Sequence, residues 1–367
     1  MTEPDFAATR LGVLMTPEPR EPREAWGVLN PAGVRSPDGA MHLFPRLVAE
    51  GNFSRIGHAR VRYDGDTPVG VERLGIALEP HEPYEVGPGG GGVEDPRVVY
   101  VPLLKRFVMT YTAYVPFEPR VAVAVSEDLQ TWQRLGLLRY EVVPGGPDHN
   151  RCGNKDAALF PDTVLDPEGA PSLAILHRPT TRVHIHYGGS DVTKPPCGEE
   201  TREHIWISYV SVESVLADLT NLTSVRRHER VMAPERSWET NKVGAGAPPV
   251  RLPYGWLLPY HAVSAVDGHP RYCMGAAILD LERPSRVLYR TPQPILEPQT
   301  DYERNGLVSN VVFPTATDLR ADGRLDVYYG AADRVVAAAR VTLPNQLPAT
   351  APSAASAHVV NGSNRKE

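Results

Sequence analysis

The sequence predicts an all-β fold made of five similar units, and three observations lead to this prediction. The 37 prolines and 31 glycines are spread along all 367 residues rather than gathered in one linker. Such punctuation favours short strands over long helices. Segments rich in β-branched and aromatic residues lie between turn signals, as is typical of strands, and they come in pairs. The pairs recur along the chain, which indicates a structural repeat.

Ten strands are expected, in five pairs. In chain order the pairs are Met41 to Val48 with Ile56 to Tyr63, Arg106 to Ala113 with Val121 to Ser126, Ser172 to His177 with Ile205 to Val210, Trp256 to Ala262 with Tyr272 to Leu279, and Leu325 to Gly330 with Val335 to Val341. The second members share a pattern of small and aliphatic residues, and they follow one another at steps of roughly 65, 84, 67 and 63 residues. An insertion between Thr181 and His204 accounts for the longest step.

This repeat predicts a five-bladed β-propeller over residues 26–343, because a four-stranded blade with long loops needs about 65 residues. A β-sandwich with coincidental spacing is the alternative. Residues 1–25 hold many charges and prolines, and we expect an N-terminal arm that packs on a neighbouring subunit of a homo-oligomer. Residues 344–367 are rich in Ala, Ser, Asn and Pro without periodicity, which predicts a disordered C-terminal tail.

The composition predicts a soluble protein of the cytoplasm. The 38 Lys and Arg against 44 Asp and Glu give a net charge of −6, which argues against nucleic acid as a partner. The three cysteines, Cys152, Cys197 and Cys273, form no CxxC motif, so a disulfide framework is not expected and a reducing compartment fits. Neither a signal peptide nor an apolar run of about 20 residues is visible, so no membrane partner is expected.

The first candidate for chemistry is the acidic pair Glu94 and Asp95, which follows a glycine run and precedes Pro96 and Arg97. The context of a phosphate-binding glycine loop, a strand before and a helix after, is missing. A buried carboxylate beside glycines can approach a substrate, and we expect burial to raise the pKa of Asp95 toward that of a general acid. The alternative is a strand-entry turn, with one acid capping backbone N–H groups and the other paired to Arg97.

Cations recur at the strand ends of successive units. They lie in Arg151 to Asp156, in His177 to Pro179, and between Asn241 and His261. A single cation of this kind is most often solvated, but a propeller turns such positions toward one central channel. In the last unit Asp333 directly follows a strand and is expected near the axis, beside aromatic residues that suit a sugar ring or simply pack in the core.

With these motifs assembled, the chain resembles glycoside hydrolase family 130, the β-mannoside phosphorylases and related β-1,2-mannosidases. The matching stretches run in family order from about residue 30 to 340 and read NPAGVRSPDG, GVEDPRVVYV, NKDAALFP, LHRP, KVGAGAPPV, GWLLPYHAV, GLVSNVVFPTA and YYGAADRVVAAA. The resemblance implies a five-bladed propeller, with Asp95 as the general acid whose proton passes through a sugar hydroxyl. It implies that Arg46 and Asp333 hold the mannosyl ring. It further implies a phosphate-binding cluster, for which the candidates are Arg151, Lys155, Arg178, Lys242 and His261.

The expected function is therefore an inverting phosphorylase. It would cleave a β-mannoside of a mannose-containing oligosaccharide with inorganic phosphate, give α-mannose 1-phosphate, and need no other cofactor and no metal. Most inverting glycosidases need a second carboxylate as base, whereas phosphate is already anionic and needs cations to position it.

Two alternatives stay open. One is an inverting β-1,2-mannosidase with Glu235, Glu239 or Glu303 as base, and the other is a non-catalytic propeller that binds glycans or proteins. The insertion holding His184, His186, Cys197 and His204 is expected to be a surface loop rather than a metal site.

Overall fold

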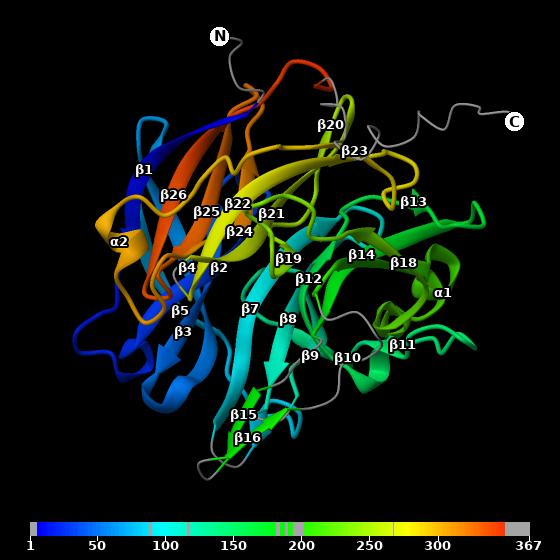
Figure 1. Cartoon of the computed structure of the whole chain (residues 1–367), viewed down its shortest axis with the longest axis horizontal. Helices are drawn as coiled ribbons and strands as arrows, with labels where there is room; N and C mark the ends of the chain where they lie inside the picture. The colour runs from blue at the N-terminus through cyan, green and yellow to red at the C-terminus, as the bar shows by residue number, and fades with distance from the viewer. Residues whose placement is uncertain are drawn as a thin grey trace, which may run out of the picture.

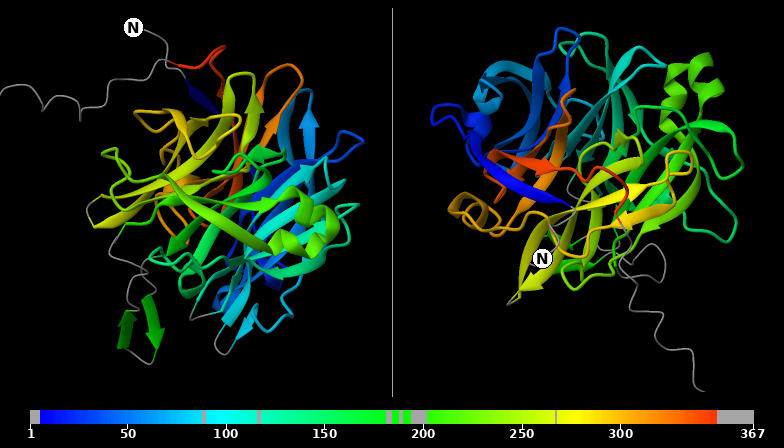
Figure 2. Two further views of the ribbon diagram at one scale, coloured as in Figure 1. Left: turned by 90° about the vertical axis from the view of Figure 1, so that its right-hand side faces the viewer. Right: turned by 90° about the horizontal axis from the view of Figure 1, so that it is seen from above.

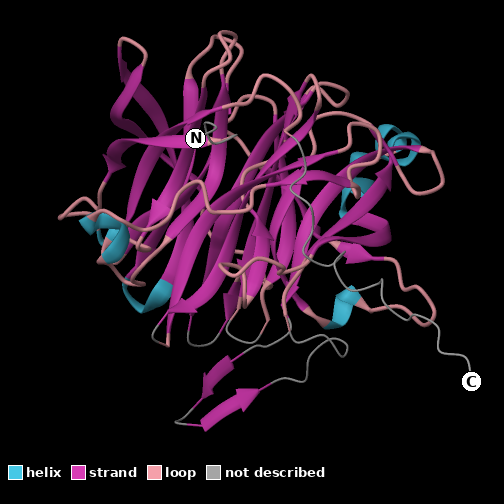
Figure 3. Ribbon diagram, turned by 45° about the horizontal axis from the view of Figure 1, so that its top comes forward, coloured by secondary structure: helices cyan, strands magenta, loops and turns pink. Residues whose placement is uncertain are grey.

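The structure, a computed structural model, describes residues 6–348 except 88–89, 116–117, 181–183, 188–189, 194–201 and 267. Strands dominate it (Figures 1 and 3). The helices in the described residues are short: α1 (Val212–Ala217), α2 (Asp301–Arg304) and the 3-10 helices Pro22–Glu24, Glu50–Asn52, His149–Arg151 and Leu219–Thr223. The predicted all-β class is thus confirmed. None of these helices has the length and apolar character that crossing a membrane requires.

We divide the main strands into five antiparallel units, numbered in chain order; a parallel bridge between Ser54 and Gly92 joins units 1 and 2 into one nine-stranded sheet. Unit 1 consists of β2 (Gly27–Arg35), β3 (Met41–Ala49), β4 (Phe53–Asp64) and β5 (Thr67–Leu78). Unit 2 consists of β7 (Gly90–Val101), β8 (Arg106–Tyr114), β9 (Arg120–Ser126) and β10 (Gln133–Leu137). Unit 3 consists of β12 (Gly153–Leu159), β14 (Pro171–Thr180), β17 (Ile205–Ser211) and β18 (Ser224–Met232). Unit 4 consists of β19 (Lys242–Ala245), β21 (Gly255–Val266), β22 (His269–Leu279) and β23 (Val287–Arg290).

Unit 5 takes its strands from both ends of the chain (Figure 1). It consists of β24 (Val312–Leu319), β25 (Leu325–Ala331), β26 (Val335–Thr342) and β1 (Ala7–Met15). The strand β1 pairs antiparallel with β26 from Ala7 opposite Thr342 to Met15 opposite Val336. Residues 7–15, which we expected within an N-terminal arm, therefore supply the outer strand of the last unit.

Smaller elements complete the description. Four short strands pair at the edges of the units: β6 (Val86–Gly87), β11 (Arg139–Tyr140), β13 (Val164–Leu165) and β20 (Val250–Leu252). Within the expected insertion, β15 (His184–Tyr187) and β16 (Ser190–Thr193) form a two-stranded sheet of their own (Figure 3). Cys197 and most of the expected disordered tail lie outside the described residues. Cys152 is disulfide-bonded, against the expectation of reduced cysteines, whereas Cys273 is free and buried.

The ten expected strands are all present, and they are the second and third strands of the five units. The middle strands read as almost continuous apolar runs because both of their faces are covered. β8 is buried from Phe107 to Ala113, and β14 from Ser172 to Pro179. Strands that are enclosed on both faces lose the alternation seen in half-exposed sheets. The first strand of each unit, by contrast, was not predicted as a strand.

The hydrophobic core is divided into five clusters, and each cluster lies between two units. One joins units 1 and 2, one joins units 2 and 3, and further clusters join units 3 and 4 and units 4 and 5. The fifth joins unit 5 to unit 1, where Tyr328 and Val336 pack with Val28 and Leu43. Every unit therefore packs against two neighbours. Because unit 5 packs against unit 1, the order of these contacts is cyclic. Figure 2 shows the units side by side in two further views.

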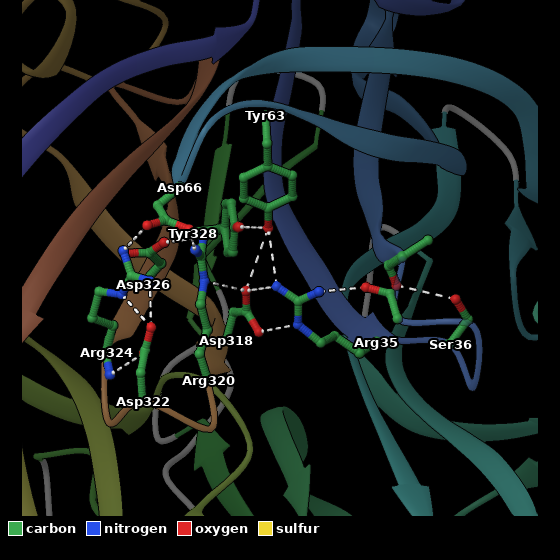
Figure 4. A network of polar contacts seen from close by, with 12 residues as sticks. Arg35, Ser36, Tyr63, Asp66, Asp318, Arg320, Asp322, Arg324, Asp326 and Tyr328 are labelled. Carbon is green, nitrogen blue, oxygen red and sulfur yellow. Dashed lines mark hydrogen bonds and ion pairs between the residues drawn. The ribbon is translucent and has the colours of Figure 1, made fainter.

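A polar network reinforces the contact between the first and the last unit (Figure 4). Arg35 of β2 donates two hydrogen bonds to the Asp318 carboxylate of β24, at 2.7 and 2.6 Å. The hydroxyl groups of Tyr63 and Tyr328 lie 3.1 Å apart. Two-point pairing of Arg with a carboxylate adds geometric specificity to the attraction. The network thus fixes how the two ends of the chain meet.

A second device repeats within the units. In units 2, 4 and 5 a buried glutamate, in the segment leading to the first strand, accepts hydrogen bonds from a tyrosine of the second strand and an arginine of the outermost strand. The three sets are Glu85, Tyr111 and Arg134; Glu239, Tyr260 and Arg290; and Glu303, Tyr329 and Arg10. Each glutamate also accepts from the backbone N–H groups three and four residues before it. We call each set a Glu-Tyr-Arg clamp, because it connects the segment that leads into the first strand with the outermost strand of the unit.

The clamp leads to a prediction about stability. The pairs Arg290–Glu239 and Arg60–Glu72 both measure 2.6 Å, but the side chains of the first are 6% and 0% exposed and those of the second 48% and 49%. Removing one partner of a buried pair leaves an uncompensated charge, so Arg290→Met should lower the free energy of unfolding by about 3–5 kcal/mol. Arg60→Met, at the exposed pair, should cause no measurable change. Urea denaturation at pH 7 measures both, and equal losses would contradict a clamp.

Candidate active site

One cavity collects side chains from all five units. It has a volume of about 190 Å³, and its lining includes Asn30 and Arg46 from unit 1 and Asp95 from unit 2. The remaining polar lining residues are Lys155, Asp156 and Arg178 from unit 3, Lys242, His261 and Tyr272 from unit 4, and Asp333 from unit 5. A concave, largely buried site with converging charged groups is the usual form of an active site.

The backbone turns polar side chains into this cavity by the same irregularity in three units. The pairing of first and second strands shifts after Leu29 in β2, after Glu94 in β7 and after Lys155 in β12. The residue that follows has a positive φ each time: Asn30 at 43°, Asp95 at 45° and Asp156 at 54°. A β-bulge re-aims a side chain, and Asn and Asp tolerate the left-handed region better than most residues. These three residues are thus equivalent in the repeat.

A second repeat position lies opposite, on the second strand. Leu29 pairs with Arg46, Lys155 with Arg178, and Gly244 with His261. The site therefore draws Arg46, Arg178 and His261 from equivalent positions of units 1, 3 and 4. Asp333 comes from the tight turn between β25 and β26, where its φ is 51°.

The cavity has an acidic side, formed by units 1, 2 and 5. The Asp95 carboxylate Oδ1 accepts hydrogen bonds from Asn30 Nδ2 at 2.8 Å and from Arg46 Nη1 at 3.3 Å. Arg46 also donates to Glu94 Oε1 at 2.6 Å and to Ser54 Oγ at 2.8 Å. This guanidinium holds both acids of the EDPR motif in place.

The structure corrects our expectation for the pKa of Asp95. Burial does favour the neutral acid, but the charges of Arg46 and Lys155 and the hydrogen bond from Asn30 outweigh it, so the pKa of Asp95 is lowered. The raised value belongs to Asp333 instead. Burial, opposed by Arg46 and assisted by the charges of Asp95 and Glu94, raises the pKa of Asp333 to about 6.

The other side of the cavity is basic and is formed by units 3 and 4. Arg178 Nε donates to Asp156 Oδ2 at 2.6 Å, and its Nη1 is paired with Glu203. Lys242 Nζ lies over the Tyr272 ring, 5.4 Å from its centroid. Burial, together with Arg178, lowers the pKa of Lys242, and burial lowers that of His261 to about 3. His261 is thus neutral near pH 7, and both of its ring nitrogens are buried without a hydrogen-bonding partner among the described residues.

Lys155 lies between the two sides. Its Nζ is 3.4 Å from Glu94 Oε2 and 5.3 Å from the centroid of the Tyr114 ring. The opposing effects on its pKa are burial, which lowers it, and the charges of Glu94 and Asp95, which raise it; the net result is a raised pKa. It carries its charge into the middle of the cavity.

Seven of the eight site residues named from the sequence lie together in this cavity: Asp95, Arg46, Asp333, Lys155, Arg178, Lys242 and His261. The eighth, Arg151, is exposed on the 3-10 helix His149–Arg151 and is not part of the lining. The three glutamates considered as a base are also elsewhere. Glu239 and Glu303 belong to Glu-Tyr-Arg clamps, and the Glu235 side chain is 63% exposed.

Sequence reasoning did not select Asn30, Asp156, Tyr272 and Phe313, which also line the cavity. Asn30 and Asp156 stood inside the quoted motifs NPAG and NKDA, so the signal was present. Among the described residues, no group of three or more His, Cys, Asp and Glu side chains is arranged to hold a metal ion. His184, His186 and Cys197 are outside the described side chains.

Comparisons with known proteins agree with one another. The family model of glycoside hydrolase family 130, described as beta-1,4-mannooligosaccharide phosphorylase, matches residues 7–347. A 1,2-beta-oligomannan phosphorylase of Thermoanaerobacter sp. (strain X514) is 29% identical over 337 residues, which cover 89% of this chain and 93% of that protein. A beta-1,4-mannooligosaccharide phosphorylase of Ruminococcus albus is 32% identical over 290 residues, 78% of this chain and 73% of that one.

Solved structures share the fold. The beta-1,2-mannobiose phosphorylase of Listeria innocua, in complex with beta-1,2-mannobiose, matches with a TM-score of 0.69 and 23% identity over 92% of this chain and 96% of that chain. A second solved structure matches with a TM-score of 0.69 and 21% identity over 96% of this chain and 98% of that chain. It belongs to a family of mannoside phosphorylases that contains glycoside hydrolases targeting beta-1,2 mannosidic linkages in Candida mannan.

The charge balance of the cavity leads to a prediction that does not depend on any activity. Because the folded protein raises the pKa of Asp333 from 3.8 to about 6, ionisation of this carboxylate destabilises the fold once the pH exceeds about 4. The penalty grows between pH 4 and 6 and is constant above. At 1.36 kcal/mol per pKa unit, Asp333→Asn should raise the free energy of unfolding at pH 7.5 by up to roughly 3 kcal/mol.

This gain should fall below about 1 kcal/mol near pH 4, where Asp333 is protonated in the folded protein and about half protonated in the unfolded chain. Denaturation in urea at pH 4, 6 and 7.5 measures it, with Asp322→Asn at an exposed site as the control that shows no gain. An Asp333→Asn protein that is less stable than the wild type at pH 7.5 would contradict the claim that the ionised Asp333 destabilises the fold.

Proposed function

Because the chain belongs to glycoside hydrolase family 130, we propose that it is an inverting β-mannoside phosphorylase. The reaction cleaves a β-mannoside with inorganic phosphate and gives α-mannose 1-phosphate and a shortened sugar. The observation that carries this proposal is the division of one cavity into an acidic side around Asp95 and a basic side around Arg178, Lys242 and His261. The names of the relatives support it, since they are mannoside phosphorylases.

We further propose that the five units are the blades of a propeller whose first strands surround one axis. The cyclic order of the five core clusters supports this arrangement. A second cavity of about 260 Å³ supports it too, because the far ends of the same strands and the segments that follow them line it. The lining includes one residue from each of the five units: Arg35 at the end of β2, Val98 of β7, Pro161 after β12, Pro248 after β19 and Asp318 of β24.

On the acidic side, Arg46 and Asp333 would hold the hydroxyl groups of the mannosyl ring, and Asp95 would supply the proton. A phosphate oxygen attacks C1 from the face opposite the leaving oxygen, and the bond from C1 to that oxygen breaks. The proton of Asp95 passes through a sugar hydroxyl to the leaving oxygen. The reaction takes up no net proton, because hydrogenphosphate loses one proton and the leaving oxygen gains one.

The lowered pKa of Asp95 fits this sequence of events if phosphate binds before proton transfer. In the free protein the cations around it keep Asp95 ionised. A hydrogenphosphate dianion on the basic side offsets Lys155 and its neighbours, which raises the pKa of Asp95. Ligand binding thus prepares the acid, and a water molecule in the same place would not.

The basic side suits phosphate. Arg178 and Lys242 supply charge, and neutral His261 offers ring nitrogens that make no hydrogen bond among the described residues. Lys155 borders both subsites. Arg and Lys bind phosphate by charge-assisted hydrogen bonds, and no base is needed to activate a nucleophile that is already anionic. Since Arg151 lies outside the cavity, the proposed phosphate subsite omits it.

The alternative of a β-1,2-mannosidase is less well supported. An inverting hydrolase needs a carboxylate base on the face opposite the acid. None of the three glutamates considered for this role lines the cavity, and the carboxylate found on its basic side, Asp156, has a pKa far below the usual range, which makes it a weak base. No cofactor beyond phosphate enters the proposal. The cytoplasmic location and the homo-oligomer stay predictions, and the disulfide at Cys152 weighs against a reducing compartment.

Replacing the acid tests the role of Asp95. Asp95→Asn keeps the shape and the hydrogen-bonding partners but cannot donate the proton, so turnover should fall at least about 100-fold, in the range of general-acid contributions. Release of mannose 1-phosphate from β-1,2- and β-1,4-mannobiose in phosphate buffer measures it, with circular dichroism as the check on folding. Asp322→Asn is the control, and an Asp95→Asn protein of near-normal activity would refute the assignment.

A matched pair of cation variants tests the phosphate subsite. Lys242→Met removes a charged donor that lines the cavity, and a hydrogen bond to a charged group is worth about 1.5–3 kcal/mol. The KM for phosphate should therefore rise at least about tenfold, whereas Arg151→Met should leave it unchanged. Initial rates over a range of phosphate concentrations at saturating mannobiose give both values. Mannose release that is independent of phosphate would instead favour the hydrolase.

A further inference from the structure

One charged group in the cavity has no part in the reaction described above. Asp156 lies on the basic side, where an anion is expected, and it is itself an anion. Its bulge position and φ of 54° turn the side chain into the cavity. Only 3% of the residue is exposed. A carboxylate at this place repels the ligand that the neighbouring cations attract, so it calls for an explanation.

The contacts of Asp156 show that it is ionised. Burial alone would favour the neutral acid, but Arg178, His261 and Arg97 outweigh burial and hold the pKa of Asp156 far below its usual range. Oδ2 accepts from Arg178 Nε at 2.6 Å and faces His261 Nε2 at 3.4 Å. Both contacts use Oδ2, which leaves Oδ1 as an acceptor. An ionised carboxylate can only accept hydrogen bonds.

The surroundings hold this carboxylate close to the anion site. A side chain at Gly244 would collide with both the His261 ring and Asp156 Oδ2, so glycine lets β19 approach the pair. The second carboxylate bound to Arg178, that of Glu203, does not line the cavity. The ligand would therefore meet Arg178, Lys242, neutral His261 and the acceptor Asp156 together.

Such a mixture distinguishes tetrahedral anions by their protons. Near pH 7 phosphate and arsenate carry at least one proton, and that proton can be donated to Asp156. Sulfate has the same shape and charge as hydrogenphosphate but no proton, so it would face the carboxylate with an unprotonated oxygen. Placing two acceptors together at a buried site costs affinity, because neither is satisfied.

We propose that Asp156 is a specificity-determining residue that admits protonated tetrahedral oxyanions, hydrogenphosphate and hydrogenarsenate, and rejects sulfate. The proposal rests on the proposed function, since it concerns the same phosphate subsite. It assigns to Asp156 a direct contact with the attacking anion and so adds this residue to those named from the sequence. The carboxylate accepts a hydrogen bond from the P–OH group and so also fixes which oxygens are free to attack.

The experiment compares sulfate with phosphate in the wild type and in Asp156→Asn. Phosphorolysis of mannobiose is measured at a phosphate concentration below KM, with sodium sulfate added and sodium chloride used to match the ionic strength. In the wild type, sulfate should inhibit no more than chloride, and arsenate should replace phosphate. In Asp156→Asn, which offers an amide donor, sulfate should compete with phosphate, with an inhibition constant at least tenfold lower than in the wild type.

Thermal unfolding with each anion gives a readout that does not need activity. Sulfate should raise the melting temperature of Asp156→Asn but not of the wild type, and phosphate should raise that of the wild type. Asp156→Glu keeps the carboxylate and should keep the rejection of sulfate even where turnover falls. A purely structural role would weaken phosphate and sulfate alike.

Two results would overturn the proposal. One is competitive inhibition of the wild type by sulfate at concentrations near the KM for phosphate, and the other is an unchanged ratio of sulfate to phosphate affinity in Asp156→Asn. Failure of the proposed function would look different, because mannose would be released without any dependence on phosphate. In that case the thermal arms still report whether the site prefers protonated anions.

Discussion

The whole site depends on a balance of buried charge at the place where the five units meet. Arg46, Lys155 and Arg178 converge there with Asp95 and Asp156 around about 190 Å³ of space. A buried charge without its partner costs several kcal/mol. Each cation therefore needs its carboxylate in position before any ligand arrives, and the scaffold has to hold groups from distant parts of the chain within hydrogen-bonding distance.

The repeat meets this requirement with few positions. One bulge position supplies Asn30, Asp95 and Asp156, and one second-strand position supplies Arg46, Arg178 and His261. Because the strands around them are enclosed on both faces, these side chains have little freedom to move apart. Glu-Tyr-Arg clamps then fix the approach to the first strand in three of the units.

Where the second strand supplies an arginine to the site, the clamp tyrosine is missing, although unit 1 keeps the buried Glu24 paired with Arg73 of its outermost strand at 2.9 Å. The clamp tyrosines directly precede Thr112, His261 and Gly330. In units 1 and 3 the second strand instead supplies an arginine, and the residues before Arg46 and Arg178 are Pro45 and His177. His177 hydrogen-bonds to Asn154 at 3.0 Å and to Ser208 at 2.8 Å. Unit 3 thus has neutral hydrogen bonds in the place of the charged clamp, next to its cations.

The sequence was sufficient to predict the apolar strands. It was not sufficient to predict the first strands, which carry residues of the candidate site. All ten predicted strands are second and third strands, whose continuous apolar character is visible in any short window. The first strands contain Asn30-Pro31, Asp95-Pro96 and a glycine-rich stretch after Lys242, residues that signal turns. Their strand character comes from the neighbours that enclose them. β1 was missed for a related reason, since its partner β26 lies more than 300 residues away along the chain.

The pKa values and positions of the charged side chains were harder to predict than the strands, because both depend on residues from other units. The pKa of Asp95 depends on Arg46 and Lys155, which are far away in the sequence, so burial alone gave the wrong direction. Arg151 stands only four residues before Lys155, yet it is the last residue of the 3-10 helix His149–Arg151 and is exposed to solvent. Local sequence shows that cations gather near this strand, but only the fold decides which of them enters the cavity.

The distribution of charge in the cavity favours a nucleophile that is already negatively charged. Water needs a base on the face opposite the acid, but the carboxylate that lines the basic side is Asp156, and its pKa is held so far below the usual range that it is a weak proton acceptor. Asp333, with its pKa near 6, is the better proton acceptor, yet it shares the acidic side with Asp95. Activating water there would place base and acid on one face of the ring. Hydrogenphosphate avoids the conflict, because its charge satisfies the cations, its proton satisfies Asp156, and its arrival raises the pKa of the acid that must act next.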